Sequence, residues 1–527
     1  MISPLPSWRR DLEVRAFMPE AIPETFNMTT ALLDCHLLAG RGERPAVVTD
    51  TAQLSYAALA EIVNQAAHGL LSLGVRAEER VMILLPDGRD FLAAFLGAMR
   101  MGAVPVPINT LSAVDDYAYY LNDSGATTLV VHDTLWERIN SVRTRASSLR
   151  TVIIAGTAPP GTISFHGLMA TSPGNLPPAS THRDQSAYWL YSSGTTGRPK
   201  GVVHLHQDMV HCIRPYAEHV LGLTSADRTY SASRLFFSYG LVNSLYLPLS
   251  VGASVVLTPD RPEPDTVLTA IRNRQPTIFF GVPSFYAALL RHMEDVTVLP
   301  DLRSLRLAVS AGEALPAALY RRWKERTGVE LLDGIGSTEF GYIFISNFPR
   351  RVKPGSSGEL IPGHEARIVT AEQLPVPDGE IGDLLIKGDS TAAGYWNKRE
   401  QTRQTFQGTW LRTGDTYHRD ADGFYWFHGR ADDLMRVNGQ YVAPLEIESV
   451  LLAHPSVSEC AVVGVPDDDG LVKPCAYVVT GSESASATDL DEFLRARLSA
   501  LKCPRWIRLV TELPKTPTGK IQRYLLR

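Results

Sequence analysis

The segment Val81–Val106, VMILLPDGRDFLAAFLGAMRMGAVPV, decides the fold class of this chain of 527 residues. It opens on an unbroken apolar run, Val81–Leu85, which ends at a Pro-Asp-Gly turn. Such runs are typical of strands that are buried on both faces of a parallel sheet. A helix-like stretch, Phe91–Met101, follows, and a second apolar run, Gly102–Val106, comes directly after it. The segment therefore predicts a strand, a helix and a second strand in succession.

The same alternation extends in both directions along the chain. A patterned helix begins after Ser55 and stops at Gly74, where its apolar spacing ends. Further along, apolar runs predict strands at 128–131, 151–155, 254–257, 277–280 and 305–309, and helical spacing predicts helices at 285–293 and 317–327. Strands and helices in this order favour doubly wound α/β layers.

The pattern changes after about residue 355. Short runs broken by Gly, Pro and Asp predict antiparallel hairpins or a small β barrel, and a compact α+β pattern of about a hundred residues follows Arg430. We therefore expect an α/β fold with two domains. Residues 1–429 would form a large N-terminal domain of two doubly wound sheets plus a small β-barrel subdomain, and residues 430–527 a small mobile α+β C-terminal domain.

The composition narrows the functional classes. Lys plus Arg number 51 and Asp plus Glu 56, and a net charge of −5 argues against a nucleic-acid-binding protein held by a basic face. A hydrophobic fraction of 44% excludes wholesale disorder, and no apolar stretch approaches the roughly 18 residues of a membrane helix. Five scattered cysteines without a C-x-x-C pair argue against disulfides and structural zinc. These cysteines, and an N-terminus without a signal peptide's apolar core, favour the cytoplasm.

The densest chemical signal is the sequence YSSGTTGRPKG at residues 191–201, after an apolar stretch that we predict as a strand. Its glycines allow a tight loop with inward backbone N–H groups, its hydroxyls add donors, and Lys200 adds a positive charge. A P-loop site is disfavoured because it needs a hydroxyl directly after the lysine, where this chain has Gly201. A plain solvent loop is the alternative. The candidate polyphosphate-binding residues are Ser192, Ser193, Gly194, Thr195, Thr196, Gly197 and Lys200.

A second glycine-rich turn follows an apolar run, in the sequence LLDGIGSTE at residues 331–339. The turn ends in two hydroxyls and a carboxylate. Glu339 is either a surface acid or a hard oxygen ligand for magnesium beside a nucleotide phosphate.

Two motifs nearer the C-terminus complete the set. The sequence RTGD at residues 412–415 precedes GRADD at 429–433, and Asp415 could accept hydrogen bonds from ribose hydroxyls with Arg430 beside it. Turn chemistry with an ordinary ion pair is the alternative. The sequence PKTPTGKIQR at residues 514–523 places Lys520 at a tip shaped by Pro and Gly, whereas most basic tails are only solvated.

Taken in order, these four motifs resemble the adenylate-forming superfamily of acyl-CoA synthetases, peptide-synthetase adenylation domains and luciferases. The resemblance spans nearly the whole chain, and it implies a two-step ligase. A carboxylate attacks the α-phosphate of ATP and gives an acyl-adenylate and pyrophosphate, after which a thiol displaces AMP. ATP, Mg²⁺ and coenzyme A are the implied cofactors and substrates.

The resemblance also implies roles for individual residues. The loop from Ser192 to Lys200 would hold the β- and γ-phosphates. Thr338 would contact the α-phosphate, and Glu339 would bind the magnesium ion. The implied adenosine-binding residues are Gly312, Glu313, Asp333, Gly334 and Ile335 around adenine, with Asp415 and Arg430 at the ribose.

Lys520 would be the principal catalyst of adenylation. An ammonium between carboxylate and triphosphate offsets their repulsion as charge moves in the transition state. The resemblance implies that the C-terminal domain swings about a hinge, here Asp432, between the half-reactions. This gating motion would withdraw Lys520 and bring Gly439, which has no side chain to block a pantetheine tunnel, to the thioester site.

Further segments resemble benzoate-CoA ligases and their aryl-CoA relatives. They lie at residues 26–28, 40–44, 236–241, 310–316, 344–347 and 470–473. Aromatic walls and glycines suit a planar ring, and plain core packing is the alternative. The acyl-pocket residues implied by this resemblance are Phe236, Ser238, Tyr239, Gly281, Ile335, Gly336 and Tyr342.

The chain departs from the benzoate pattern at two positions. Benzoate enzymes typically carry histidine where this chain has Tyr342, and alanine where it has Ser238. Two phenols and a hydroxyl facing the ring could bind an amino or hydroxyl substituent. We therefore expect an AMP-forming aryl-CoA ligase for a ring-substituted benzoate, such as 2-aminobenzoate or a hydroxybenzoate.

Three alternatives stay open. The enzyme could prefer benzoate itself, or it could adenylate an aryl acid and load a separate carrier protein. A non-catalytic nucleotide-binding protein is the alternative of another class, and it requires a vestigial lysine and phosphate loop.

The chain ends seven positions after Lys520, which leaves no room for a fused carrier domain downstream and favours free coenzyme A as the acceptor. The expected partners are therefore a small aromatic carboxylic acid and coenzyme A, with no nucleic acid and no membrane. A homodimer is one option for the assembly.

Overall fold

The computed structural model describes residues 21–192, 198–295, 301–433, 435–437, 440–467, 471–481, 485–515 and 521–527. The predicted site residues Ser193, Gly194, Thr195, Thr196, Gly197, Gly439 and Lys520 lie outside these ranges. Within them, no helix combines the length and apolar character needed to span a bilayer.

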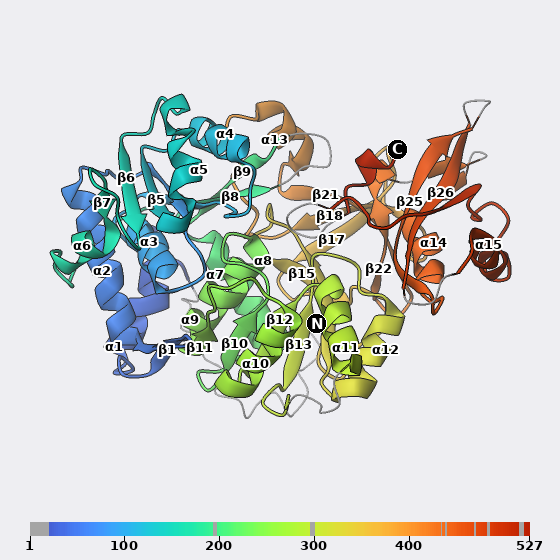
Figure 1. The fold of residues 1–527 in the computed structure, drawn as a ribbon, viewed down its shortest axis with the longest axis horizontal. Coiled ribbons are helices and arrows are strands. Elements are labelled where there is room, and N and C mark those ends of the chain that lie inside the picture. Colours follow the sequence, from blue (N-terminus) through green and yellow to red (C-terminus); the bar gives the residue numbers. More distant parts are fainter. Residues whose placement is uncertain are drawn as a thin grey trace.

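A nine-stranded sheet forms the centre of the molecule (Figure 1). The strands from β14 to β1 in the order below are parallel, and β15, β16 and β2 add antiparallel edges. In spatial order the strands are β16 (Glu359–Leu360), β15 (Ile343–Ser346), β14 (Leu331–Gly336), β13 (Leu307–Ser310), β12 (Ile278–Gly281), β10 (Arg228–Ser231), β11 (Ser254–Val256), β1 (Pro45–Val48) and β2 (Gln53–Ser55).

The segment Val81–Val106 forms part of a second, parallel sheet. It folds as β3 (Arg80–Leu84), α3 (Arg89–Arg100) and β4 (Val104–Pro107), so the predicted strand–helix–strand unit is confirmed. The other strands of this five-stranded sheet are β5 (Thr128–His132), β6 (Thr151–Ala155) and β7 (Ile163–Ser164), in the order β4-β3-β5-β6-β7. The fold class is therefore the expected one.

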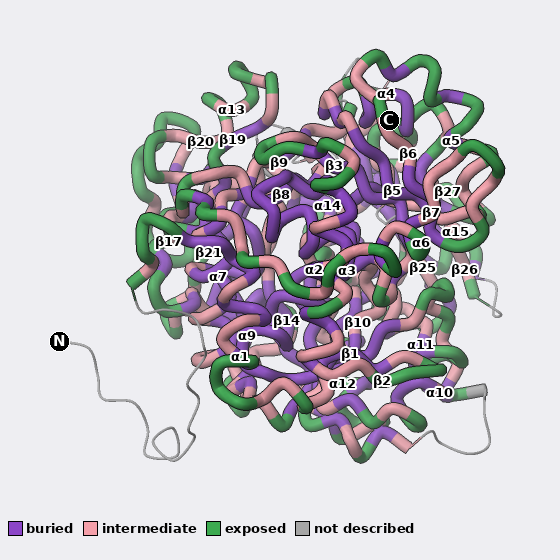
Figure 2. The backbone as a smooth tube through the Cα atoms, turned by 90° about the vertical axis from the view of Figure 1, so that its left-hand side faces the viewer, coloured by how far each residue is buried: buried purple, intermediate pink, exposed green. Residues whose placement is uncertain are grey.

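Helices cover the sheets with their apolar faces. The predicted helix after Ser55 is α2 (Tyr56–Ser72), and the Ser55 side chain accepts a hydrogen bond from its first turn, a standard N-cap. It packs closely on α3, because a Cβ at Gly97 would lie only 2.9 Å from Ala66 Cβ. Buried backbone follows the strands and these two helices (Figure 2).

The remaining helices of the N-terminal part connect the strands. They are α1 (Cys35–Leu38), α4 (Val114–Ser124), α5 (Trp136–Asn140), α6 (Phe165–Ala170), α7 (Asp208–Pro215), α8 (Ser238–Leu241), α9 (Leu247–Val251), α10 (Pro264–Arg274), α11 (Pro283–Asp295), α12 (Ala317–Thr327) and α13 (Arg399–Thr405). Wider π-type turns, η5 (Tyr216–Leu221) and η6 (Val242–Tyr246), follow α7 and α8.

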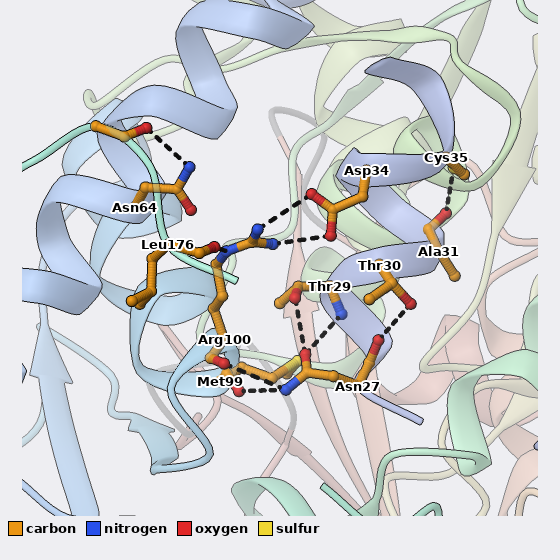
Figure 3. A network of polar contacts seen from close by, with 11 residues as sticks. Asn27, Thr29, Thr30, Ala31, Asp34, Cys35, Asn64, Met99, Arg100 and Leu176 are labelled. Carbon is orange, nitrogen blue, oxygen red and sulfur yellow. Dashed lines mark hydrogen bonds and ion pairs between the residues drawn. The ribbon is translucent and has the colours of Figure 1, made fainter. Parts of the chain in front are cut away.

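A polar network fixes the N-terminal segment to α3 (Figure 3). Arg100 pairs with both carboxylate oxygens of Asp34, at 3.0 and 3.2 Å, and its Nε donates to the carbonyl oxygen of Leu176. The Asn27 amide donates to the carbonyl oxygen of Met99 at 3.0 Å. Asn27, one of the residues that resemble benzoate-CoA ligases, therefore has a structural role here.

A third, small sheet was not predicted. It consists of β8 (Ser186–Ser192), β9 (Lys200–Leu205) and β19 (Gly394–Tyr395), in the antiparallel order β19-β9-β8. Two residues from β19 complete this sheet far along the chain, which explains why local patterns did not reveal it.

The β-rich part after residue 355 forms a five-stranded antiparallel sheet. Its order is β17-β18-β21-β20, and β22 also pairs with β21, so the described strands branch where a small barrel was expected. The reason is the ten-residue strand β21, which pairs with β20 at one end and with β22 at the other. The strands are β17 (Glu365–Val369), β18 (Gly382–Lys387), β20 (Phe406–Gln407), β21 (Trp410–Arg419) and β22 (Tyr425–Arg430).

The C-terminal part has its own core and packs α14 against β22 (Figure 1). Its elements are β23 (Met435–Val437), β24 (Gln440–Val442), α14 (Pro444–Leu451), β25 (Val457–Pro466), β26 (Val472–Thr480), α15 (Ala487–Arg495) and β27 (Trp506–Leu509). Helix α15 is shorter than the predicted helix at 489–501. Leu498 and Leu501 continue its apolar spacing, and they pack on the core from turns beyond the helix.

Candidate functional site

Three predicted segments meet at one edge of the nine-stranded sheet. Gly281 at the end of β12 lies opposite Ser310 of β13, and Ser310 lies opposite Asp333 of β14. The turn after β13, which contains Gly312 and Glu313, therefore starts beside Asp333. Open α/β sheets bind ligands outside the carboxyl ends of their strands, so this edge is the candidate adenine site.

The Asp333 carboxyl group is buried at this edge. Its Oδ1 has no hydrogen-bond partner among the described residues, and burial raises the pKa of Asp333 well above its ordinary value. A buried acceptor without a partner costs free energy. A ligand that donates a hydrogen bond, such as the amino group of adenine, fits this position. The next residue, Gly334, has no room for a side chain, since a Cβ would lie 2.8 Å from the carbonyl oxygen of Ile345.

The predicted phosphate loop closes a β hairpin. Strands β8 and β9 pair antiparallel, and Ser192 lies directly opposite Lys200 at the base of the loop. Tyr119 of α4 donates to the carbonyl oxygen of Pro199 at 2.6 Å, and its ring lies 5.1 Å from the Arg198 guanidinium. The hairpin end is therefore anchored to α4.

Glu339 lies beside this hairpin. Ser192 Oγ donates to Glu339 Oε1 at 2.9 Å, and the Tyr395 hydroxyl donates to the same oxygen at 2.8 Å. No described residue donates to Oε2. A carboxylate with one oxygen fixed and the other without a protein donor suits Mg²⁺, which prefers carboxylate oxygens and phosphates as ligands.

Tyr395 connects Glu339 to Lys200. The Lys200 ammonium lies 4.2 Å from the centroid of the Tyr395 ring, within range of cation–π attraction. Burial raises the pKa of Tyr395, and the charge of Glu339 raises it further, so the hydroxyl keeps its proton and donates. The structure thus brings together Ser192, Lys200 and Glu339 as the sequence predicted, and it adds Tyr395.

Asp123 at the end of α4 stabilises the small sheet that carries the hairpin. It accepts a hydrogen bond from the Tyr191 hydroxyl at 2.9 Å and pairs with Lys398 at 2.9 Å. The indole of Trp396 donates to its carbonyl oxygen. Strand β8 and the segment that follows β19 are therefore tied to one helix end.

Asp415 and Arg430 form a pair across β21 and β22. Asp415 Oδ1 lies 2.9 Å from Arg430 Nη1, which also donates to the carbonyl oxygen of Thr413 at 3.1 Å. Gly414 has a positive φ of 76°, and a Cβ there would lie 2.9 Å from Arg430 Nη2. The predicted neighbours are therefore in contact, and their ribose role stays a prediction.

Most of the predicted acyl-pocket residues lie together. The rings of Tyr239 and Tyr342 stack with their centroids 6.2 Å apart at 21°, and Tyr216 packs edge-on against Tyr342 at 5.1 Å. The Tyr239 hydroxyl lies 3.5 Å from the carbonyl oxygen of Gly281. Such rings offer flat faces to an aromatic acid.

Gly336 is in close contact with Tyr342 of this aromatic group, whereas Phe236 packs against a different ring. A Cβ at Gly336 would lie 2.4 Å from the carbonyl oxygen of Tyr342, so only glycine allows this approach of β14 to the Tyr342 turn. The Phe236 ring is buried and packs against Phe237 at 4.6 Å. Its place in the pocket stays a prediction.

Each of the three hydroxyls predicted to face the ring gives its proton to a protein oxygen. Ser238 Oγ donates to the carbonyl oxygen of Gly341 at 2.7 Å. The Tyr239 hydroxyl donates to a carbonyl oxygen of β13 at 3.0 Å, and the Tyr342 hydroxyl donates to Asn243 Oδ1. The Asn243 amide nitrogen is buried and has no hydrogen-bond partner among the described residues. What these three hydroxyls can offer a ligand is therefore a lone pair and not a proton.

The predicted hinge residue lies in a connection between two strands. Asp432 is in a single 3₁₀ turn, Ala431–Asp433, between β22 and β23. Next to it, Asp433 Oδ1 pairs with Arg527 Nη2 at 2.6 Å. Its function as a hinge stays a prediction.

Lys520 lies outside the described residues, and the structure shows the base of its loop. Lys515 and Ile521 form an antiparallel bridge, and Gln522 N donates to the carbonyl oxygen of Pro514 at 2.8 Å. The two ends of the loop are thus held side by side.

A buried ion pair anchors this base to the C-terminal core. Arg523 Nη2 lies 3.0 and 2.9 Å from the two carboxylate oxygens of Glu448, which is 3% exposed. Glu448 Oε1 also accepts a hydrogen bond from Val462 N at 2.7 Å. Arg523 therefore ties the segment after Lys520 to α14 and β25.

We expect Arg523→Met to lower the free energy of unfolding of the C-terminal part by about 3 kcal/mol, because it leaves the Glu448 carboxylate buried without its cation. Arg495→Met is the matched control, since Arg495 forms a solvent-exposed pair with Asp491 whose removal should change stability little. Unfolding in urea, monitored by the susceptibility of the C-terminal part to proteolysis, measures the stability of both variants. Equal losses in the two variants would contradict the role of the buried pair.

Sequence reasoning missed Tyr395, Asn243 and Asp123. Each is remote in the chain from the motif that it supports, and none stands in a conspicuous local pattern. Only a signal that relates distant positions could have revealed them.

Comparison with known proteins decides the family. The AMP-binding enzyme family model matches residues 36–396, and the model of the AMP-binding enzyme C-terminal domain matches residues 446–520. The chain belongs to the AMP-binding enzyme family. The first match covers the phosphate hairpin and Glu339, and the second extends to Lys520, so the resemblance stated from the four motifs is confirmed.

This AMP-binding enzyme has close relatives along its whole length. It is 44% identical over 512 residues to benzoate–CoA ligase of Thauera aromatica, with 96% of each chain covered. It is 42% identical to 4-hydroxybenzoate–CoA/benzoate–CoA ligase of Rhodopseudomonas palustris, with 95% of this chain and 94% of that one covered. A solved structure of the anthranilate CoA ligase AuaEII in complex with anthranoyl-AMP superposes with a TM-score of 0.91 at 42% identity, covering 96% and 97% of the chains.

Proposed function

We propose that this AMP-binding enzyme is an ATP-dependent aryl-CoA ligase that converts a ring-substituted benzoate to its CoA thioester. The coarser activity, that of an AMP-forming acid–CoA ligase, follows from the family and from relatives that cover the whole chain. The observation that carries the finer assignment is the short turn from Thr338 to Tyr342. It holds Glu339 at the phosphate hairpin and Tyr342 in the aromatic group, so an aryl acid there lies beside the triphosphate.

The chain's own residues divide the first half-reaction between them. Ser192 and Lys200, with the loop between them, hold the β- and γ-phosphates, and Thr338 contacts the α-phosphate. Glu339 would hold the magnesium ion, which would supply positive charge to the phosphates. The substrate carboxylate forms a bond to the α-phosphorus as the bond to pyrophosphate breaks.

The nucleoside part of ATP lies at the edge of the nine-stranded sheet. Its adenine sits among Asp333, Gly334 and Ile335 on one side and the Gly312–Glu313 turn on the other. Asp415 and Arg430 hold the ribose hydroxyls. The orphaned Asp333 Oδ1 supports this placement, because adenine brings a donor.

The domains divide at residue 430, with residues 1–429 forming the adenylation domain and residues 430–527 the mobile lid. Lys520 lies between the two anions during adenylation and stabilises the charge that shifts toward pyrophosphate. Rotation about Asp432 then brings Gly439 to the tunnel through which the thiol of coenzyme A enters. The thiol loses its proton to solvent and its sulfur bonds to the acyl carbon. The bond from that carbon to the phosphate oxygen breaks, and AMP leaves with the electron pair.

The hydroxyl protons that are already donated to protein oxygens support a particular kind of ring substituent. Ser238, Tyr239 and Tyr342 can each accept a hydrogen bond, and none can donate without losing a bond to the protein. An amino or hydroxyl group on the ring brings its own proton and satisfies such an acceptor. A fluoro or methoxy group brings only lone pairs and faces oxygen. The pocket therefore favours 2-aminobenzoate and hydroxybenzoates.

We expect ATP–pyrophosphate exchange to separate matched substrates. Because a hydrogen bond in a desolvated site is worth about 0.5–1.5 kcal/mol, and an unmatched acceptor adds a penalty, amino- or hydroxybenzoate should exceed the fluoro and methoxy analogues in kcat/KM by about 10-fold. Benzoate outperforming every substituted acid would move the assignment to benzoate–CoA ligase. AMP release that depends on coenzyme A would exclude an enzyme that only loads a carrier protein.

A further inference from the structure

A buried histidine supports the Thr338–Glu339 turn from behind. His204 lies on β9, and its Nε2 is 2.7 Å from the carbonyl oxygen of Thr338. Its Nδ1 is 3.1 Å from Asp208 Oδ2 at the start of α7. The side chains of His204 and Asp208 are 0% and 1% exposed. Nothing in the proposed reaction uses this pair.

The surroundings hold the imidazole in place. The ring of Tyr188 on β8 stacks on His204 with the centroids 5.0 Å apart at 13°. On the other side, Gly341 comes so close that a Cβ there would lie 3.5 Å from His204 Cε1 and 2.7 Å from Met209 Cε. The same Gly341 donates its N–H to the Thr338 carbonyl oxygen at 3.1 Å. The turn is therefore packed directly on β9 and α7.

The hydrogen bonds fix where the protons are. A carbonyl oxygen can only accept, so His204 Nε2 must carry a proton and donate to Thr338. Asp208 Oδ2 also accepts the N–H of Leu205 at 2.9 Å, which fixes the carboxylate and orients it toward Nδ1. A single proton lies between Nδ1 and Oδ2, whichever of the two atoms holds it. The tautomer of a histidine is set by the bond at its other nitrogen, and here Asp208 sets it.

Other titratable groups surround the pair. Tyr188 on β8, Tyr246 in η6 and Cys212 on α7 lie around it, and Asp184 precedes β8. Burial raises the pKa of Asp208, the hydrogen bond with His204 opposes this, and the charge of Asp184 adds to it. Burial also raises the pKa values of Tyr188, Tyr246 and Cys212, so these three neighbours stay neutral.

We propose that His204 and Asp208 are positioning residues for adenylation, which hold the Thr338 carbonyl and thereby aim the Thr338 and Glu339 side chains at the triphosphate. The proposal rests on the proposed function of that turn. The dyad orients a main-chain oxygen, so its loss displaces the Thr338 and Glu339 side chains together without removing either of them.

Asp208→Asn tests the proton arrangement. The asparagine oxygen can still accept from Leu205 N and from His204 Nδ1, but a neutral imidazole then has no proton left at Nε2. Its lone pair would face the Thr338 carbonyl. We expect adenylation to fall about 10- to 100-fold relative to the unaltered enzyme.

A pair of substitutions at His204 tests the donated proton directly. His204→Gln can still donate an amide N–H to Thr338 and should retain most of the adenylation rate. His204→Leu fills a similar volume without a donor and should lose about 10- to 100-fold. In both variants the melting temperature is recorded beside the ATP–pyrophosphate exchange rate and the Mg²⁺ concentration that gives half of it.

The outcomes separate the proposal from its alternatives. A higher Mg²⁺ requirement in His204→Leu than in His204→Gln, with a loss of adenylation in Asp208→Asn, supports the positioning role. Equal rates in Gln and Leu variants of similar stability, or an unchanged rate in Asp208→Asn, overturn it. Absence of exchange with any aryl acid in the unaltered enzyme would instead overturn the proposed function, whatever the variants do.

Discussion

Lys520→Ala is expected to lower the rate of adenylate formation by about 10²- to 10³-fold, the cost of removing one preorganised positive group from a transition state of shifting charge. Thioester formation from supplied acyl-AMP should remain within about 3-fold, because the lysine is proposed to leave the site before the thiol attacks. The base of its loop is held by Arg523 and Glu448, so the alanine variant should retain its fold.

Two assays on one preparation make this comparison. ATP–pyrophosphate exchange measures the first half-reaction, and thiol consumption with synthetic aryl-AMP measures the second. Lys387→Ala is the control, because it removes an equal charge from an exposed pair with Glu365. An equal loss in both half-reactions would contradict two conformations of the C-terminal part.

Glu339→Gln should have an effect of similar size, a loss of about 10²- to 10³-fold in adenylation, with a raised Mg²⁺ requirement. The substitution is specific for a structural reason. Ser192 and Tyr395 both donate to Oε1, so the glutamine oxygen takes that position and keeps both bonds. The amide nitrogen then occupies the place of Oε2, where it cannot bind a metal.

The Mg²⁺ titration distinguishes metal binding from simple packing. Glu365→Gln, on the exposed partner of Lys387, is the matched control and should leave the titration unchanged. A Glu339→Gln variant that reaches the original rate at the original Mg²⁺ concentration would show that Glu339 is a surface acid.

Much of the architecture could be predicted because local sequence patterns determine it. The helix predicted at 317–327 is α12 with the same bounds, and the unit at Val81–Val106 folds as expected. Parallel strands buried on both faces require unbroken apolar runs, and tight phosphate loops require glycine. Both requirements produce a pattern that can be recognised within about a dozen consecutive residues.

The site's supporting contacts could not be predicted in this way. Glu339 accepts hydrogen bonds from residues 147 positions earlier and 56 positions later in the chain. The hydrogen-bond acceptor of Tyr342 lies 99 positions away. The extent of helix α15 was overestimated because Leu498 and Leu501 keep its spacing without its backbone. Spacing reports which side chains are buried, and the backbone that buries them can differ.

The sequence by itself determined the fold class, the order of the four motifs and the chemical kinds of group at the site. Only the tertiary structure decided to which acceptor each pocket hydroxyl donates its proton. Ser238, Tyr239 and Tyr342 were expected to bind a ring substituent, and the structure shows that each donates its proton to a protein oxygen, which leaves a lone pair for the ligand. The direction of a hydrogen bond depends on which acceptors folding brings near, and those acceptors come from strands and turns far along the chain.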